Sequence, residues 1–295
     1  MRRPRSASFP AVVWMSISMG VTLSPGRHYC GAVSSNALDP VRITALLGER
    51  SLWERVESVT STGSTNADLA ALARLGEPEG RVLVASEQTA GRGRLDRTWV
   101  SPRGASLSLS MLLKPVHEFP RWGWLSLLTG MAVASALGDI APDPSLVQLK
   151  WPNDVLIDGG KVCGILSERI EHPTGARAVV GVGLNLELTP QELPVPTATS
   201  LSMEGFPVDP EAIVAGVLGH MERYYRLWQR SGSLAGEYRA RCSSVGSELT
   251  ITVAPDVVVR GRGYGVDEFG RLQVATATGL ETFAVGDVVH ARLHR

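Results

Sequence analysis

A change of pattern near residues 243–246 constrains the fold more than any other feature of the sequence. Between about residue 40 and residue 243, apolar segments of helical length alternate with short apolar runs typical of strands. Beyond that point only short β-rich runs remain, separated by Gly or Asp turns. Alternating elements build a sheet covered by helices, whereas closely spaced strands build a small barrel. The sequence therefore predicts an α/β domain with a mixed sheet, followed by a small β-barrel.

The expected helices and strands follow from the spacing of apolar residues along the sequence. Helices are expected over residues 41–50, 67–75, 122–137 and 210–230. Strands are expected over 81–85, 106–113, 147–150, 155–157, 162–166, 178–188, 249–253, 257–262, 272–275, 282–283 and 288–293. The run at 106–113 alternates Ser with Leu or Met, which predicts a half-buried strand.

Composition and cysteine usage exclude several classes of protein. Apolar residues make up 44% of the chain, and Lys+Arg (29) equals Asp+Glu (29), so a disordered chain is excluded and a dedicated nucleic-acid binder is disfavoured. The three cysteines, Cys30, Cys163 and Cys242, form no C-x-x-C pair. No histidine spacing suits a metal site, so we expect no bound structural metal and buried, unpaired thiols.

Residues 1–38 differ from the rest of the sequence. Three arginines precede an apolar stretch over residues 11–23, which superficially resembles a signal peptide. That stretch is shorter than the roughly 20 residues of a membrane-spanning helix. We interpret residues 1–38 as a disordered tail or a mis-assigned start, and expect no membrane association.

Three segments have compositions that suit the binding of an anionic or polar ligand. Residues 87–99 (EQTAGRGRLDRTW) carry three arginines and two glycines after a strand, which suits phosphate or carboxylate binding, although a solvated basic loop has the same composition. Lys161 follows a Gly-Gly turn and precedes an apolar strand, where a lysine can meet an anion or simply lie at the surface. Ser64-Thr65-Asn66 begin a helix, as a ligand-binding group or as an ordinary N-cap.

Taken together and in order, the motifs resemble those of biotin protein ligases. The resemblance covers residues 59–295 and rests on GSTN at 63–66, EQTAGRGR at 87–94, KWPNDVL at 150–156, GGKVCGIL at 159–166 and GVGLN at 181–185. It implies a mixed-sheet ligase core of the class II synthetase and biotin–lipoate ligase type over residues 39–243. It also implies a small SH3-like β-barrel over residues 244–295.

The resemblance implies an activity and a set of site residues. Biotin would be activated with ATP to biotinyl-5′-AMP and transferred to a lysine of a biotin carboxyl carrier protein domain, with Mg²⁺ accompanying pyrophosphate. Lys161 and Arg94 would be the catalytic cations. The biotin site would comprise Ser64, Thr65, Asn66, Gln88, Arg92, Gly93, Arg94, Lys161 and Gly164. Arg97, Asn153 and Asn185 would contact the nucleotide.

One departure and two alternatives accompany this resemblance. Leu95-Asp96 stand where the family often has a glycine, which puts closure of the arginine-rich loop in question.

The segment before GSTN shows no pair of helices for DNA binding, so we expect a cytoplasmic ligase that binds no DNA, as a monomer or homodimer. The alternatives are a lipoate or octanoate ligase of the same fold and a biotin-responsive transcriptional regulator.

Overall fold

The computed structural model describes residues 37–48, 51–254 and 257–290. The interpretation of residues 1–38 therefore falls almost wholly outside the described residues, as does Cys30. Cys163 and Cys242 are buried and unpaired, as expected.

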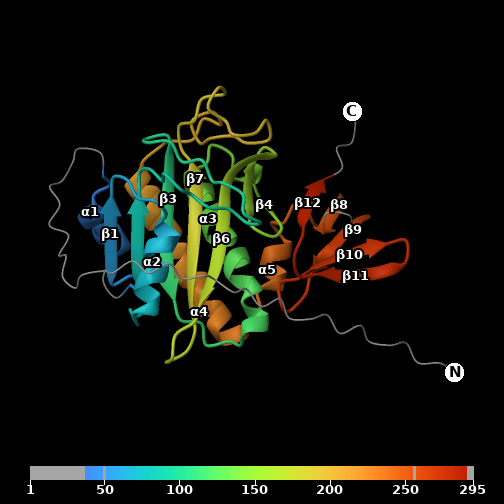
Figure 1. The fold of residues 1–295 in the computed structure, drawn as a ribbon. Coiled ribbons are helices and arrows are strands. Elements are labelled where there is room, and N and C mark those ends of the chain that lie inside the picture. The colour runs from blue at the N-terminus through green and yellow to red at the C-terminus, as the bar shows by residue number, and fades with distance from the viewer. Residues whose placement is uncertain (1–36, 49–50, 255–256, 291–295) are drawn as a thin grey trace. The chain divides into compact units, whose positions relative to one another are not determined.

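A seven-stranded mixed sheet forms the larger part of the described structure (Figure 1). Its strand order is β1-β2-β3-β7-β6-β5-β4, and only β1 and β2 pair in parallel. The strands are β1 (Arg55–Val59), β2 (Arg81–Ala85), β3 (Ser106–Leu113), β4 (Val147–Lys150), β5 (Asp154–Ile157), β6 (Gly160–Ile170) and β7 (Arg177–Asn185). The expected mixed sheet is confirmed, with β1 as a strand that the sequence did not indicate.

Helices cover both faces of this sheet. On one face, α2 (Thr65–Arg74) packs Leu69 and Ala73 against β3 and β7. On the other face lie α3 (Gly123–Ile140) and α4 (Pro210–Ser231), which contact each other, with α1 (Pro40–Leu47) beside α4 (Figure 1). The helical segment Phe119–Ile140 is long and apolar enough to cross a membrane, but 67% of its most apolar window is buried, as in a core helix. A short helix, α5 (Ala235–Arg239), leads to the C-terminal part.

The expectation of a half-buried β3 is wrong, because all eight of its residues are buried. Its Leu and Met side chains at positions 107, 109, 111 and 113 belong to the main apolar core, which also contains α3. Its serines face the opposite side, where Ser110 donates to Asn66 Oδ1 (2.6 Å) at the start of α2. The alternation therefore separates an apolar face from a small polar face, and both faces are covered.

The C-terminal part is a five-stranded antiparallel sheet in the order β11-β10-β9-β8-β12, as expected for a small SH3-like barrel. Its strands are β8 (Glu248–Ala254), β9 (Val257–Val266), β10 (Leu272–Thr276), β11 (Gly279–Phe283) and β12 (Asp287–His290). Two buried indoles attach it to the larger part. Trp151 Nε1 donates to the carbonyl of Gly270 (3.0 Å), and Trp124 Nε1 donates to that of Glu268 (2.8 Å). Both contacts join the larger part to the connection between β9 and β10.

Candidate active site

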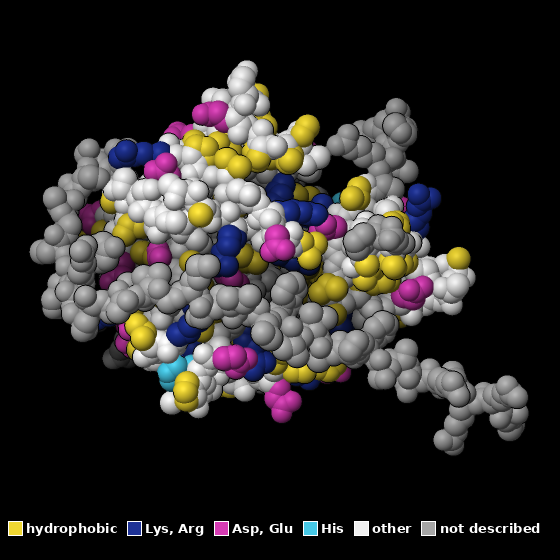
Figure 2. Space-filling model, viewed as in Figure 1, with side chains coloured by type: hydrophobic (Ala, Val, Ile, Leu, Met, Phe, Trp, Pro, Cys, Tyr) yellow, Lys and Arg dark blue, Asp and Glu magenta, His cyan; other side chains and the backbone are white. Residues whose placement is uncertain are grey.

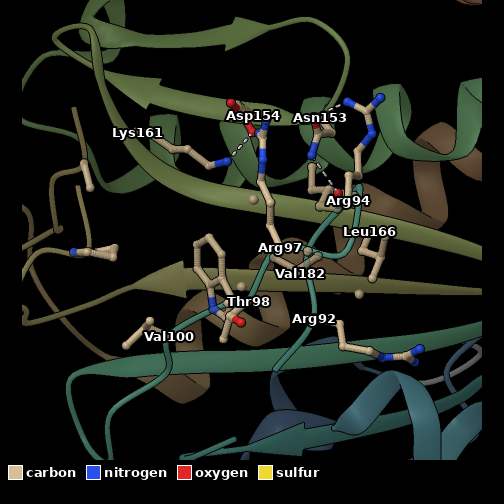
Figure 3. Close-up of a pocket in the computed structure, with 18 of the residues that line it drawn as sticks. Arg92, Arg94, Arg97, Thr98, Val100, Asn153, Asp154, Lys161, Leu166 and Val182 are labelled. Carbon is tan, nitrogen blue, oxygen red and sulfur yellow. Dashed lines mark hydrogen bonds and ion pairs between the residues drawn. The ribbon is translucent and has the colours of Figure 1, made fainter. Parts of the chain in front are cut away.

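A cavity of about 530 Å³ lies on the α2 face of the sheet, where the predicted motifs meet. All twelve residues expected from the resemblance line it: Ser64, Thr65, Asn66, Gln88, Arg92, Gly93, Arg94, Arg97, Asn153, Lys161, Gly164 and Asn185. Residues 91–98, which we call the arginine loop, cross one side of the cavity (Figure 3). Asp287 and Val288 of β12 line it as well. On the face seen in Figure 2, basic and acidic side chains gather between the larger sheet and the C-terminal strands.

Small residues on three neighbouring strands create the space for this cavity. Ser108, Gly183 and Gly164 pair across β3, β7 and β6, so they form one row on the α2 face. The indole of Trp99 lies on this row, and a Cβ atom added at Gly183 would lie 2.3 Å from Trp99 Cε2. In the next row, a Cβ at Gly181 would lie 2.2 Å from Asn66 Oδ1. The glycines of the GVGLN motif are therefore required for close packing of site residues.

Lys161 projects into the cavity from the start of β6. Its Nζ lies 2.6 Å from Asp154 Oδ1 (Figure 3). The same atom lies 5.9 Å from the centre of the Trp99 ring. Backbone hydrogen bonds with Thr197 and Thr199 hold Lys161 on its other side. An ammonium group in this position is partly buried and can bind an anionic ligand.

The three arginines of the arginine loop bind three different elements. Arg92 pairs with Glu168 on β6 (Nη2 to Oε2, 3.2 Å), and Arg97 pairs with Asp287 on β12. Arg94 donates from Nη1 to Asn153 Oδ1 (3.0 Å) in the turn between β4 and β5 (Figure 3). Burial lowers the pKa of Arg94 from its ordinary value, although the group stays charged. The loop is thus tied to the sheet and to the C-terminal strands at once.

The arginine loop is a closed hairpin in this structure. Arg92 and Thr98 form a β-bridge, and the amide of Gly93 donates to the carbonyl of Arg97 (2.7 Å). Leu95 and Asp96 form its tip with positive φ angles of 54° and 58°. Both central residues of a type I′ turn need such angles, which Asn and Gly adopt more readily than Leu. The departure from the family pattern therefore lies at two loop positions whose positive φ angles would suit glycine.

The start of α2 also lines the cavity, through the buried residues Ser64, Thr65 and Asn66. The Ser64 hydroxyl accepts from the amide of Ala67 (3.4 Å), so the ordinary N-cap is also present. Thr65 donates from its amide (2.9 Å) and hydroxyl (3.1 Å) to Gln88 Oε1. These two bonds direct the side-chain carbonyl of Gln88 to Thr65. The side-chain nitrogen of Gln88 is then the group that can donate to a ligand.

The two asparagines expected to contact the nucleotide both donate hydrogen bonds to backbone carbonyls of the chain. Asn153 Nδ2 donates to the carbonyl of Ile165 (2.9 Å), and Asn185 Nδ2 donates to that of Thr199 (2.8 Å). Both side chains are thereby fixed at the cavity wall, and their contact with a nucleotide stays a prediction.

Three charged residues of the cavity were not assigned from the sequence: Lys150, Asp154 and Asp287. Burial lowers the pKa of Lys150, an effect that nearby Asp154 opposes and Lys161 reinforces. Among the described residues, the Lys150 ammonium group makes no hydrogen bond or ion pair, so it is a partly buried cation without a direct partner. Its place before the Trp-Pro-Asn turn was a signal that could have identified it, whereas Asp287 reaches the cavity only through packing of the C-terminal strands.

The described residues contain no group of three or more His, Cys, Asp and Glu side chains that could form a protein metal cage. The carboxylates of Asp154 and Asp287 nevertheless line the cavity. One or two carboxylates suit Mg²⁺ that is held mainly by water and substrate phosphates.

Comparisons with known proteins agree with this geometry. Residues 55–185 match the Biotin/lipoate A/B protein ligase family, and residues 245–291 match the Biotin protein ligase C terminal domain. The chain is 40% identical over 252 residues to the biotin--[acetyl-CoA-carboxylase] ligase of Mycobacterium tuberculosis, covering 84% of this chain and 93% of that protein. It is 31% identical to the enzyme of the same name from Paracoccus denitrificans, covering 77% of this chain and 97% of that protein.

A solved structure supports the same assignment. The biotin protein ligase of Aquifex aeolicus, in complex with biotin and ATP, superposes with a TM-score of 0.67 at 26% identity, covering 81% of this chain and 99% of that one. Sequence, fold and cavity agree that this chain belongs to the biotin protein ligase family.

Proposed function

We propose that the cavity activates biotin with ATP and passes the biotinyl group to a lysine of a biotin carboxyl carrier domain of acetyl-CoA carboxylase. The single observation that carries this proposal is the convergence of Lys161, Arg94 and Arg97 with the neutral polar end at Ser64, Thr65 and Gln88 in one cavity. Relatives named as biotin--[acetyl-CoA-carboxylase] ligases support the choice of substrate and carrier.

The first reaction joins two anions, and the cations of the cavity offset their repulsion. An oxygen of the biotin carboxylate attacks the α-phosphorus of ATP, a new P–O bond forms, and pyrophosphate leaves with the electrons of the broken bond. Lys161 would lie beside the carboxylate and the α-phosphate, where negative charge accumulates on the non-bridging oxygens. Arg94, fixed by Asn153, would hold the phosphate in line with the attacking oxygen.

The neutral polar end suits the ureido ring of biotin. A ureido group carries two N–H donors and one carbonyl acceptor, so it needs hydroxyl and amide partners rather than charges. Ser64, Thr65, Asn66 and Gln88 supply such groups, with Gln88 offering its amide nitrogen. Gly93 would allow backbone approach to the ligand, and Gly164 would let Trp99 and Lys161 pack closely beside it. Arg92 belongs to the arginine loop.

Arg97, Asn153 and Asn185 would bind the nucleotide, and Lys150 would join them at the phosphates. Mg²⁺ would neutralise charge on the phosphates of ATP and pyrophosphate, with Asp154 or Asp287 as its protein ligand. The chain's own residues supply the remaining positioning. Because the reaction consumes ATP and modifies a carboxylase, we place it in the cytoplasm, catalysed by a monomer or homodimer without DNA.

In the second reaction, the neutral amine of the carrier lysine attacks the acyl carbon of biotinyl-5′-AMP, and AMP leaves. This mixed anhydride hydrolyses in water, so it must be covered until the lysine arrives. The arginine loop, anchored by ion pairs on two sides, is placed to cover it.

The proposal is tested by incubating the purified chain with ATP and either labelled biotin or labelled lipoate, each with its own carrier domain. We expect ATP-dependent label on the biotin carrier lysine and none on the lipoyl domain. Transfer of lipoate alone would refute the proposal. A biotin-dependent gel shift with the biotin operon promoter would support the regulator instead.

A further inference from the structure

Glu168 is a carboxylate that contacts two parts of the proposed machinery, the start of α2 and the arginine loop. Its Oε2 accepts a hydrogen bond from Asn66 Nδ2 (2.7 Å) and lies 3.2 Å from Arg92 Nη2. Asn66 belongs to the end of the cavity that suits the ureido ring, whereas Arg92 belongs to the arginine loop. One oxygen atom therefore joins two elements that are 26 residues apart in the sequence.

Strand register explains why Glu168 occupies this position. Along β6, Gly164, Leu166 and Glu168 point to the same face because successive strand residues alternate. Gly164 lies beneath Trp99, Leu166 pairs with Gly181 beneath Asn66, and Glu168 pairs with Val179 in the following row. The carboxylate thus lies one row beyond Asn66, within reach of Arg92. The Arg92 side chain extends away from Lys161 (Figure 3).

Two acceptors determine which end of the Asn66 amide faces the cavity: Glu168 Oε2 (2.7 Å), which makes the shorter bond, and the carbonyl of Leu166 (3.3 Å). A carboxylate only accepts hydrogen bonds, so it selects the NH₂ end of Asn66. The carbonyl end then accepts from Ser110 (2.6 Å) over Gly181 and keeps a second lone pair. An acceptor in that place suits an N–H of a ureido ring.

We propose that Glu168 is a positioning residue for the ligase reaction, which orients Asn66 toward biotin and anchors Arg92 so that the arginine loop retains biotinyl-5′-AMP. This inference rests on the proposed function. The Arg92–Glu168 pair is partly exposed, with side-chain exposures of 49% and 25%. Since an exposed pair contributes little to folding, loss of this pair should change ligand retention much more than stability.

The two contacts can be separated by substitution. Glu168→Gln keeps an oxygen that accepts from Asn66 but removes the charge that binds Arg92, whereas Glu168→Ala removes both contacts. Arg92→Gln removes only the ion pair between the arginine loop and Glu168. Glu171→Gln is the matched control, because Glu171 is a largely exposed carboxylate just beyond β6 that pairs only with Arg169 among the described residues.

The experiment first confirms that the wild-type chain forms labelled biotinyl-5′-AMP, since failure at that stage refutes the proposed function rather than this inference. Preloaded adenylate is then chased with unlabelled biotin and ATP, and biotin KM is measured separately. We expect Glu168→Gln to release adenylate about tenfold faster with biotin KM nearly unchanged. Glu168→Ala should also raise biotin KM about tenfold, and Glu171→Gln should match the wild type.

A double-mutant cycle distinguishes a shared contact from independent defects. If Arg92 and Glu168 act through each other, Arg92→Gln combined with Glu168→Gln should release adenylate no faster than either single variant. Wild-type release rates and biotin KM in both Glu168 variants would overturn the inference, as would fully additive effects in the cycle. Thermal unfolding of each variant identifies any loss that comes from the fold alone.

Discussion

The indole of Trp99 lies directly on Gly183, so closely that a Cβ atom at position 183 would be 2.3 Å from Cε2 of the ring. The same indole approaches Gly164 on the neighbouring strand, where a Cβ would be 2.9 Å from Cζ3. Trp99 directly follows the arginine loop, and the centre of its ring lies 5.9 Å from Lys161 Nζ, so its position couples the sheet to the Lys161 side of the cavity.

Gly183→Ala should therefore displace Trp99. We expect a loss of about 1–3 kcal/mol in the free energy of unfolding, as for other overpacked sites, together with weaker biotin binding. Denaturant unfolding and calorimetry measure the two effects. Gly219→Ala is the control, because no neighbouring atom lies within 4 Å of a Cβ at that helical position. Equal behaviour of the two variants would contradict the close packing of Trp99.

Lys161→Ala should stop formation of biotinyl-5′-AMP while leaving the fold intact. Removal of the cation at the reacting carboxylate and phosphate should lower the rate of the first step by at least about 10²–10³-fold. Release of labelled pyrophosphate reports the rate, and circular dichroism reports the fold. The chain contains only three lysines, and exposed Lys114 provides the control Lys114→Ala. Normal accumulation of adenylate by Lys161→Ala would exclude the proposed role.

Lys150 should make ATP binding sensitive to alkaline pH. Burial lowers its pKa below the usual lysine value of 10.5, and the group is charged only below that pKa. Affinity for ATP should thus be full at pH values well below the lowered pKa and fall as the pH rises through it. Lys150→Arg should keep its affinity at higher pH, because arginine stays charged.

Lys150→Gln supplies the complementary test. We expect it to weaken ATP binding about tenfold, as for loss of one charge-assisted contact. It should transfer biotin normally from preformed biotinyl-5′-AMP, because pyrophosphate takes no part in the second reaction. Equal losses in both half-reactions would show that Lys150 does not act only on the phosphates of ATP that leave as pyrophosphate.

The tip of the arginine loop should be stabilised by restoring residues that favour positive φ. Leu95→Asn combined with Asp96→Gly should raise the free energy of unfolding by about 1 kcal/mol, since a left-handed conformation is costly for Leu. The midpoint of urea denaturation measures this gain. An unchanged or lower midpoint would show that the positive φ angles store no strain.

Local chemistry made much of the fold predictable. The Ser/Leu alternation of residues 106–113 identified β3 with its observed bounds, and the Asp209-Pro210 pair began α4 as expected. Burial of both β3 faces was missed, because alternation records the polarity of a face and not what covers it. The strand β1 was missed because its residues (RVESV) are mostly polar at an edge of the sheet.

Twelve of the residues that line the cavity could be named from the motifs alone, because five short motifs in a fixed order identify one family. Tertiary structure alone decided how those residues are held. Asp287 approaches Arg97 across 190 positions, and Glu168 approaches Asn66 across 102. Such contacts depend on strand register and on the packing of the C-terminal sheet. These bring together side chains that are distant in the sequence, and no local pattern of residues encodes that proximity.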